Sequence, residues 1–224
     1  MTSSQIYRIS GLGLVLGAFA FVVHVVLISW MTAGVDPSIA AKLRLWMPVN
    51  VLGVVGAVFV LLGMPAMYAR VAAKAGVFGL VGVALMALAW VFFGLFLNLY
   101  GALVFPWLAA KAASLVAASA PLPAVILVAF AVGLAAWFAG GVLFGLPFIR
   151  GRFGPCWVGY LLPASALWVV LGDVVIAPGG PAADLGLNLL SNLGPVLLLV
   201  AIGYLGFQMW QDGTPSEVRP TPLH

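Results

Sequence analysis

The chain has 224 residues, of which 65% are hydrophobic and only 6% are charged. Soluble domains carry roughly 25% charged residues, so a single soluble core could not bury this much apolar surface, and the solvent must be largely lipid. The formal net charge is +4, but the nine lysines and arginines are spread over short loops rather than along one stripe, which argues against a nucleic-acid partner. The lone cysteine, Cys156, allows no intramolecular disulfide and no cysteine-rich metal site.

The lengths of the apolar runs predict the fold. A helix needs about 20 apolar residues to cross the hydrocarbon core of a bilayer. On that template we expect an all-α, polytopic six-helix transmembrane bundle in one domain over residues 1–210, with spans near 8–31, 46–69, 76–104, 122–148, 155–177 and 187–210. The first run exceeds the roughly 7–15 apolar residues of a signal peptide and leads into further spans, so we interpret it as a transmembrane helix.

The connections on the two sides of the bundle differ in length. In the first of the longer ones, Asp36 is suited to cap a helix and Pro37 to open it. Ile39, Leu43 and Trp46 then follow at helical spacing, which predicts a short helix on the membrane surface. The stretch 107–120 fits a second such helix or an ordered loop equally well.

The basic residues predict the orientation. An even number of spans places both termini on one side, and that side carries six basic residues, whereas the opposite connections carry three. The first group is Arg8, Arg70, Lys74, Arg150, Arg152 and Arg219, and the second is Lys42, Arg44 and Lys111. The positive-inside rule therefore predicts cytoplasmic termini in the cell (inner or plasma) membrane. The end of the chain, 211–224, has no apolar periodicity and contains three prolines, so we expect a disordered cytoplasmic tail.

Glycines recur three or four residues apart inside the predicted spans. Examples are Gly13 with Gly17 and Gly141 with Gly145. Small residues at this spacing let helix backbones approach closely in lipid, which favours tight bundle packing over a pliable helix or a substrate path.

Two side chains that titrate near neutral pH fall inside predicted spans, His24 and Asp173. By helix rise they lie about 10 Å and about 6 Å below the same outer boundary. Exposing a carboxylate to lipid costs about 2.5–3.5 kcal/mol even on the gentler insertion scale, so Asp173 needs a partner, water or a proton. His24 is one candidate partner.

Like His24 and Asp173, the neutral polar residues lie mainly in the outer half of the predicted spans. Asparagines among them can line a wet cavity. We therefore expect a small, outward-open, ligand-binding pocket formed by His24, Asn50, Asn98, Asp173 and Asn192. In the alternative reading, Asp173 caps a surface loop and His24 bonds a backbone carbonyl.

No sequence motif indicates catalysis, a metal or a cofactor. Zinc-binding His motifs, phosphate-binding glycine loops and nucleophile elbows are missing from the sequence, and no lysine falls mid-span to form a Schiff base. We expect no cofactor, and an enzyme is unsupported.

The opening "RISGLGLVLGAF", the stretch "LLGMPAMYARVAAKAGVFGLVGVAL" and the six-span layout resemble uncharacterised bacterial integral membrane proteins that are grouped as domains of unknown function. The resemblance covers about the first half of the chain. It implies a helical membrane fold and a bacterial source, and it assigns no functional residue.

Three classes of function remain. The first is a protein that binds or transports a small molecule or lipid through the outer pocket. The second is an accessory subunit that packs against a larger membrane complex, and the third is a membrane enzyme acting on a lipid-soluble substrate. If the protein binds a ligand in the pocket, His24 and Asp173 should face the inside of the bundle. If it is an accessory subunit, these residues or the glycine-rich helix faces should point outward toward a partner.

Overall fold

A computed structural model of the chain describes residues 3–117, 123–151, 154–176 and 184–212. These residues form helices and turns, and no strand occurs among them. Six helical segments within the described ranges are long and apolar enough to cross a membrane, as predicted. They are Ser4–Thr32, Trp46–Ala72, Ala75–Lys111, Ala124–Ile149, Cys156–Ile176 and Leu193–Asp212. The chain is therefore a multi-pass membrane protein.

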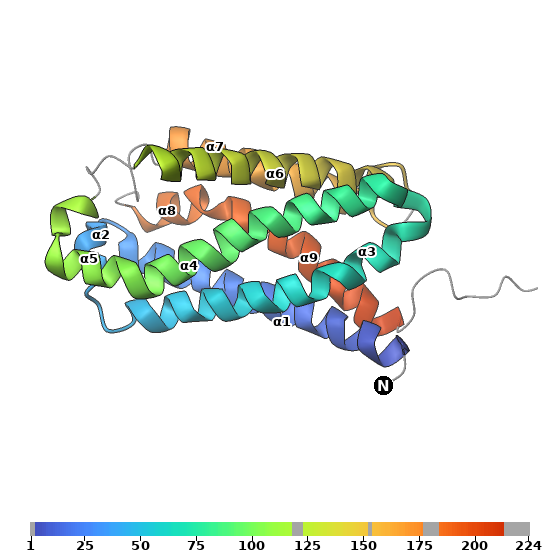
Figure 1. Cartoon of the computed structure of the whole chain (residues 1–224), viewed down its shortest axis with the longest axis horizontal. Helices are drawn as coiled ribbons and strands as arrows, with labels where there is room; N and C mark the ends of the chain where they lie inside the picture. Colours follow the sequence, from blue (N-terminus) through green and yellow to red (C-terminus); the bar gives the residue numbers. More distant parts are fainter. Residues whose placement is uncertain (1–2, 118–122, 152–153, 177–183, 213–224) are drawn as a thin grey trace, which may run out of the picture.

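The spans form a closed ring. Helix α1 (Ser3–Thr32) packs against α3 (Trp46–Trp90) and α9 (Leu193–Asp212). Helix α6 (Ala124–Ile149) packs between α3 and α7 (Cys156–Leu171), and α7 returns to α9 (Figure 1). Neighbours in sequence are thus neighbours in space, as short connections favour.

Figure 1 shows two different ends of this bundle. The first described residues and the end of α9 lie together at what we call the terminal end. The opposite end, which we call the pocket end, holds the short helices α2 (Pro37–Ala40), α5 (Phe105–Lys111) and α8 (Leu185–Ser191). A small apolar cluster there joins α2, α5 and the neighbouring ends of α1 and α3; it consists of Met31, Ala40, Ala41, Trp46, Val49, Ala109 and Val116.

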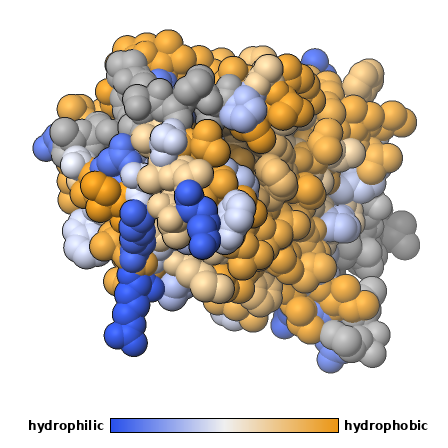
Figure 2. Space-filling model, turned by 60° about the vertical axis from the view of Figure 1, so that its left-hand side comes forward, coloured by the Kyte–Doolittle hydropathy of each residue, from blue (hydrophilic) through white to orange (hydrophobic). Residues whose placement is uncertain are grey.

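Apolar side chains cover most of the face seen in Figure 2, and hydrophilic ones gather toward the pocket end. Exposed residues at that end include Lys42, Arg44 and Lys111. Many large hydrophobic side chains are exposed along the spans, such as Phe19, Leu62 and Val132. Since the helices satisfy their own backbone groups, such a surface suits lipid.

Reciprocal glycine contacts bring the helices together. An added Cβ on Gly17 of α1 would lie 2.8 Å from the carbonyl oxygen of Gly56, and one on Gly56 would lie 2.9 Å from that of Gly17. Three further pairs contact each other in the same reciprocal way: Gly11 with Gly206, Gly82 with Gly140, and Gly145 with Gly159. The glycines therefore serve the bundle packing that their spacing indicated.

Several predicted boundaries need correction. The predicted connection at 70–76 is present but shorter than expected, because α3 consists of two arms, Trp46–Ala72 and residues 75–90, and the chain turns between them at Gly76, whose φ of 54° glycine adopts without strain. The third span does not end at 104 as predicted, because the helical segment continues through α5 to Lys111. The last predicted span is interrupted at Asn192, between α8 and α9, and α9 extends to Asp212. The remainder of the predicted tail, 213–224, lies outside the described residues.

At the first connection, the capping prediction is confirmed. Asp36 Oδ1 accepts a hydrogen bond of 2.8 Å from the backbone N–H of Ser38, and Pro37 opens α2. The predicted single face is only partly present, because Ile39 and Leu43 are exposed whereas Trp46 is buried and donates its indole N–H to Gly101 O.

Candidate functional site

A cavity of about 260 Å³ lies inside the bundle, toward the pocket end. Its lining comes from five of the six spans; the span that contributes no lining residue is Trp46–Ala72, the first part of α3. The polar lining residues are His24, Asn98, Asp173, Ser191 and Asn192. Four of these were predicted from the sequence, and the structure brings those four together around one space.

His24 is held in place by the backbone of a neighbouring helix. Its side chain is buried, and its Nδ1 lies 2.9 Å from Val49 O. Because a carbonyl oxygen can only accept, Nδ1 carries the proton of this bond, and Nε2 is an acceptor in the neutral imidazole. Phe21 packs edge-on against the ring, with 5.2 Å between the centroids. His24 thus both bonds a backbone carbonyl and lines the cavity. For this residue the two readings of the sequence, pocket residue and carbonyl-bonded histidine, are therefore compatible.

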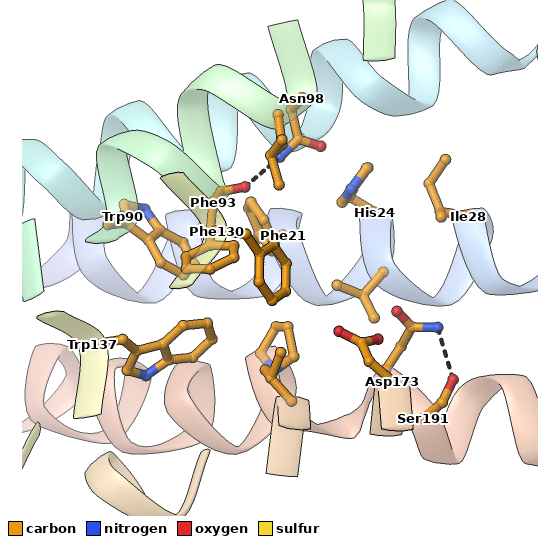
Figure 3. Close-up of a pocket in the computed structure, with 15 residues that line it drawn as sticks. Phe21, His24, Ile28, Trp90, Phe93, Asn98, Phe130, Trp137, Asp173 and Ser191 are labelled. Atoms are coloured by element: carbon orange, nitrogen blue, oxygen red, sulfur yellow. Dashed lines mark hydrogen bonds between the residues drawn. The ribbon is translucent and has the colours of Figure 1, made fainter. Parts of the chain in front are cut away.

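Asp173 faces the same space from the opposite side. It lies in a short π-helix, η4 (Gly172–Ile176), which continues α7, and Figure 3 shows its carboxylate directed toward the side on which Phe21 and His24 lie. The side chain is exposed, and no described residue gives it a hydrogen bond or an ion pair. His24 and Asp173 share the cavity without forming an ion pair: no nitrogen of His24 lies within 4.0 Å of the carboxylate.

The two cavity asparagines use their amide nitrogens on their own helices. Asn98 Nδ2 donates to Gly94 O at 2.7 Å, and Asn192 Nδ2 donates to Asn188 O at 2.8 Å. Ser191, beside Asn192, donates its hydroxyl to Asn188 O at 2.9 Å. These polar groups are therefore rigidly oriented, with their donors turned toward the protein backbone.

Asn50 departs from the prediction, because it does not line the cavity. It is buried between the first part of α3 and the segment around Gly101. Its Nδ2 donates to Trp46 O at 2.9 Å, and its Oδ1 packs against Gly101. Gly101 lies in η2 (Tyr100–Val104), another short π-helix. Helix periodicity alone placed Asn50 at a suitable depth, but its direction is set by this interface.

Aromatic side chains form the deeper part of the cavity, and sequence reasoning missed them. They are Phe21, Trp90, Phe93, Phe130 and Trp137. Figure 3 shows the two tryptophans toward one end of the space and Asp173 and Ser191 toward the other. Both indole N–H groups are satisfied inside the protein: Trp90 donates to Ala57 O at 3.2 Å, and Trp137 to Ser165 Oγ at 2.9 Å.

Two of the helix irregularities border this cavity. Phe93 lies in η1 (Val91–Phe96), and Asp173 lies in η4. Short π segments inside α-helices are rare and occur frequently at functional sites, because they turn side chains away from the regular helical direction. Nothing in the apolar sequence pattern distinguishes them.

A second polar cluster lies at the terminal end, where the sequence suggested an almost apolar interior. Arg70 is buried; its Nη1 lies 3.1 Å from an Asp212 oxygen and its Nη2 donates to Gln208 Oε1 at 2.9 Å. Tyr7 of α1 lies at 3.5 Å from Nη1. The cluster joins α1, α3 and α9, so Arg70 serves as a structural tie in addition to its place in the basic connection.

Comparison with known proteins adds no further assignment. No family model matches the chain, and no match was found among curated proteins or solved structures. The resemblance to uncharacterised bacterial membrane proteins therefore stays a prediction. Within the described ranges, no group of three or more His, Cys, Asp or Glu side chains could hold a metal ion.

Proposed function

We propose that this membrane protein binds a small molecule in the cavity between its spans, reached from the pocket end. The observation that carries the proposal is Asp173, a carboxylate with no partner among the described residues, facing a cavity enclosed by five spans. An ionisable side chain within a transmembrane segment is costly and is typically retained for binding or transport.

The form of the cavity supports a small ligand. Its volume of about 260 Å³ is just below the roughly 300–1,000 Å³ typical of sites for drug-sized molecules. Its lining combines apolar and aromatic surface with a few fixed polar groups, which is the usual composition of a ligand site. A compact molecule, or the head of a lipid, would fit such a space.

We further propose that the pocket end faces the outside of the cell membrane and that both termini are cytoplasmic. The unequal numbers of basic residues on the two sides support this orientation. In this orientation α2 and α5 lie at the outer membrane surface, next to the apolar cluster that joins them to the bundle.

The accessory-subunit alternative has less support. It requires polar or glycine-rich faces that are free to contact a partner. The glycines of the four reciprocal pairs are instead occupied in contacts between the chain's own helices. His24 is buried, and Asp173, although exposed, lines the same cavity as His24.

Filling the cavity tests the proposed function. Leu97, in α4 (Leu97–Leu99), lines the cavity, whereas Leu99 on the same short helix is 40% exposed and does not. Leu97→Trp should remove a small molecule that co-purifies with the wild-type protein from native membranes, as detected by native mass spectrometry. The matched control Leu99→Trp should retain it. Equal content of bound small molecules in wild type and Leu97→Trp, with both folded, would overturn the proposal.

A further inference from the structure

The lining of the cavity offers almost no free hydrogen-bond donors. The indole N–H groups of Trp90 and Trp137, the Nδ1–H of His24 and the hydroxyl of Ser191 all donate to protein acceptors. The amide nitrogens behave likewise. Asn98 Nδ2 has carbonyl acceptors at 2.7 and 3.4 Å. Asn192 Nδ2 has acceptors at 2.8 and 3.4 Å.

The groups that remain for a ligand are acceptors. Asp173 contributes two carboxylate oxygens, and the neutral imidazole of His24 contributes Nε2. The amide oxygen of Asn192, whose nitrogen is already engaged, is a third. A ligand that is itself only an acceptor, such as a carboxylate or phosphate, would find no donor among these described side chains and would be repelled by Asp173.

No described residue compensates the charge of Asp173 either. None of the described residues that line the cavity is a lysine or an arginine, and Asp173 forms no ion pair with any described residue. A buried or membrane-embedded charge is tolerated when an opposite charge reaches it. Water or a proton would also satisfy the carboxylate, but a cationic ligand would supply the opposite charge that the described lining lacks.

The deeper part of the cavity suits the remainder of such a ligand. Phe21 and Trp90 lie with ring centroids 4.8 Å apart, and Phe93 lies 5.0 Å from Phe130 and 5.5 Å from Trp137. Aromatic rings bury apolar groups well and attract cations to their faces. This surface begins beside the acceptor groups, as Figure 3 shows for Phe21 and Asp173.

From the acceptor groups, the uncompensated carboxylate and the adjoining aromatic surface, we infer that the ligand is a small organic cation. Its ammonium group lies against Asp173, His24 and Asn192, and its apolar body lies among the aromatic rings. This inference rests on the proposed function and specifies its ligand class.

Three probes with the same carbon skeleton test the ligand class: 3-phenylpropylammonium, 3-phenylpropan-1-ol and 3-phenylpropionate. Isothermal titration calorimetry on the full chain in nanodiscs should show the ammonium binding at least about tenfold more tightly than the alcohol, and no binding of the carboxylate; tenfold corresponds to 1.4 kcal/mol. Asp173→Asn should abolish the preference for the ammonium over the alcohol.

Asp184→Asn is the matched control, because Asp184 makes the same charge change at an exposed helix cap outside the cavity. Asparagine also caps helices well, so this variant should fold and keep the full preference.

Several outcomes would overturn the inference. Equal affinity for ammonium and alcohol, tighter binding of the carboxylate, or an unchanged preference in Asp173→Asn would each contradict it. If none of the probes binds but Leu97→Trp still loses a native occupant, the ligand class is wrong and the proposed function stands. If Leu97→Trp also changes nothing, both fail.

Discussion

At the scale of single residues, the proposed function makes Asp173 a binding residue and not a stabilising one, in keeping with the lack of any described residue that pairs with its charge. Residues arranged for function are often not the most stable choice for the fold. Asparagine has nearly the same shape but no charge to desolvate. We therefore expect Asp173→Asn to unfold at the same temperature as wild type or higher, measured by thermal unfolding in one detergent, while losing its preference for cations. A clear drop in the unfolding temperature would show that Asp173 is structural.

Arg70 illustrates the opposite role, since its guanidinium is buried and its partners are side chains of the protein. Asp212→Asn would leave this charge with weaker neutral partners. Because Asp212 is 40% exposed, water screens its interaction with Arg70. We therefore expect the free energy of unfolding to fall by about 1–2 kcal/mol, which is near the low end of the loss caused by removing a charged partner.

The unfolding temperature of Asp212→Asn in detergent measures this loss, with Asp184→Asn as the control for removing one carboxylate. If the two variants were equally stable, the Arg70 cluster would not tie the terminal end together.

Residues of the site differed in how well the sequence revealed them. His24 and Asp173 stand out because ionisable side chains are rare in apolar runs. Trp90 and Trp137 do not, since tryptophan suits lipid, interface and core alike, and only the fold turns these two toward the cavity. Asn50 was expected in the site because of its depth, but its partner is the backbone at Gly101, which no local pattern indicates.

At the scale of elements, a reciprocal contact joins the two arms of the longest hairpin. The sequences Asn50-Val-Leu-Gly53 and Asn98-Leu-Tyr-Gly101 lie opposite each other, so that each asparagine oxygen packs against the other segment's glycine. An added Cβ on Gly101 would lie 2.5 Å from Asn50 Oδ1, and one on Gly53 would lie 2.5 Å from Asn98 Oδ1. The contact fixes the side chain of Asn98, which lines the cavity. Gly53 also lies beside the ring of His24, because an added Cβ there would be 3.0 Å from His24 Cγ.

This arrangement predicts a rescue between two substitutions. The three heavy atoms nearest to a Cβ at Gly101 all belong to the side chain of Asn50. Gly101→Ala alone should lower the free energy of unfolding by about 1–3 kcal/mol, because overpacking forces side chains out of place. Adding Asn50→Ala should recover much of this loss, and a double-mutant cycle by thermal unfolding would measure the coupling. Purely additive effects would contradict the contact.

Element boundaries were less predictable than the elements themselves. Hydropathy located every span because about 20 apolar residues are needed whatever their neighbours are. It located the turn near Gly76 but not its shortness, and it missed the break at Asn192, since each depends on the backbone of one or two residues. The π segments also follow from packing rather than from composition, as the wholly apolar η1 shows.

At the scale of the whole molecule, the ring of helices has the cavity toward its pocket end and the Arg70 cluster at its terminal end. The natural cysteine reports on orientation, because Cys156 is exposed at the start of α7, on the terminal side. In spheroplasts we expect a membrane-impermeant maleimide to leave Cys156 unlabelled and a permeant one to label it.

A second cysteine position provides the matched control. In a Cys156→Ser background, Lys42→Cys at the exposed pocket end should react with the impermeant reagent. Labelling of Cys156 but not of position 42 from outside would reverse the proposed orientation.

The location of the ligand can be measured directly by crystallography with a heavy-atom probe. Crystals grown with 3-(4-bromophenyl)propylammonium should show one anomalous bromine peak in the deep part of the cavity, beside Trp90 and Trp137, with the ammonium density against Asp173. A bromine peak confined to the lipid-facing surface, or no peak within the bundle at saturating probe, would contradict ligand binding in this cavity.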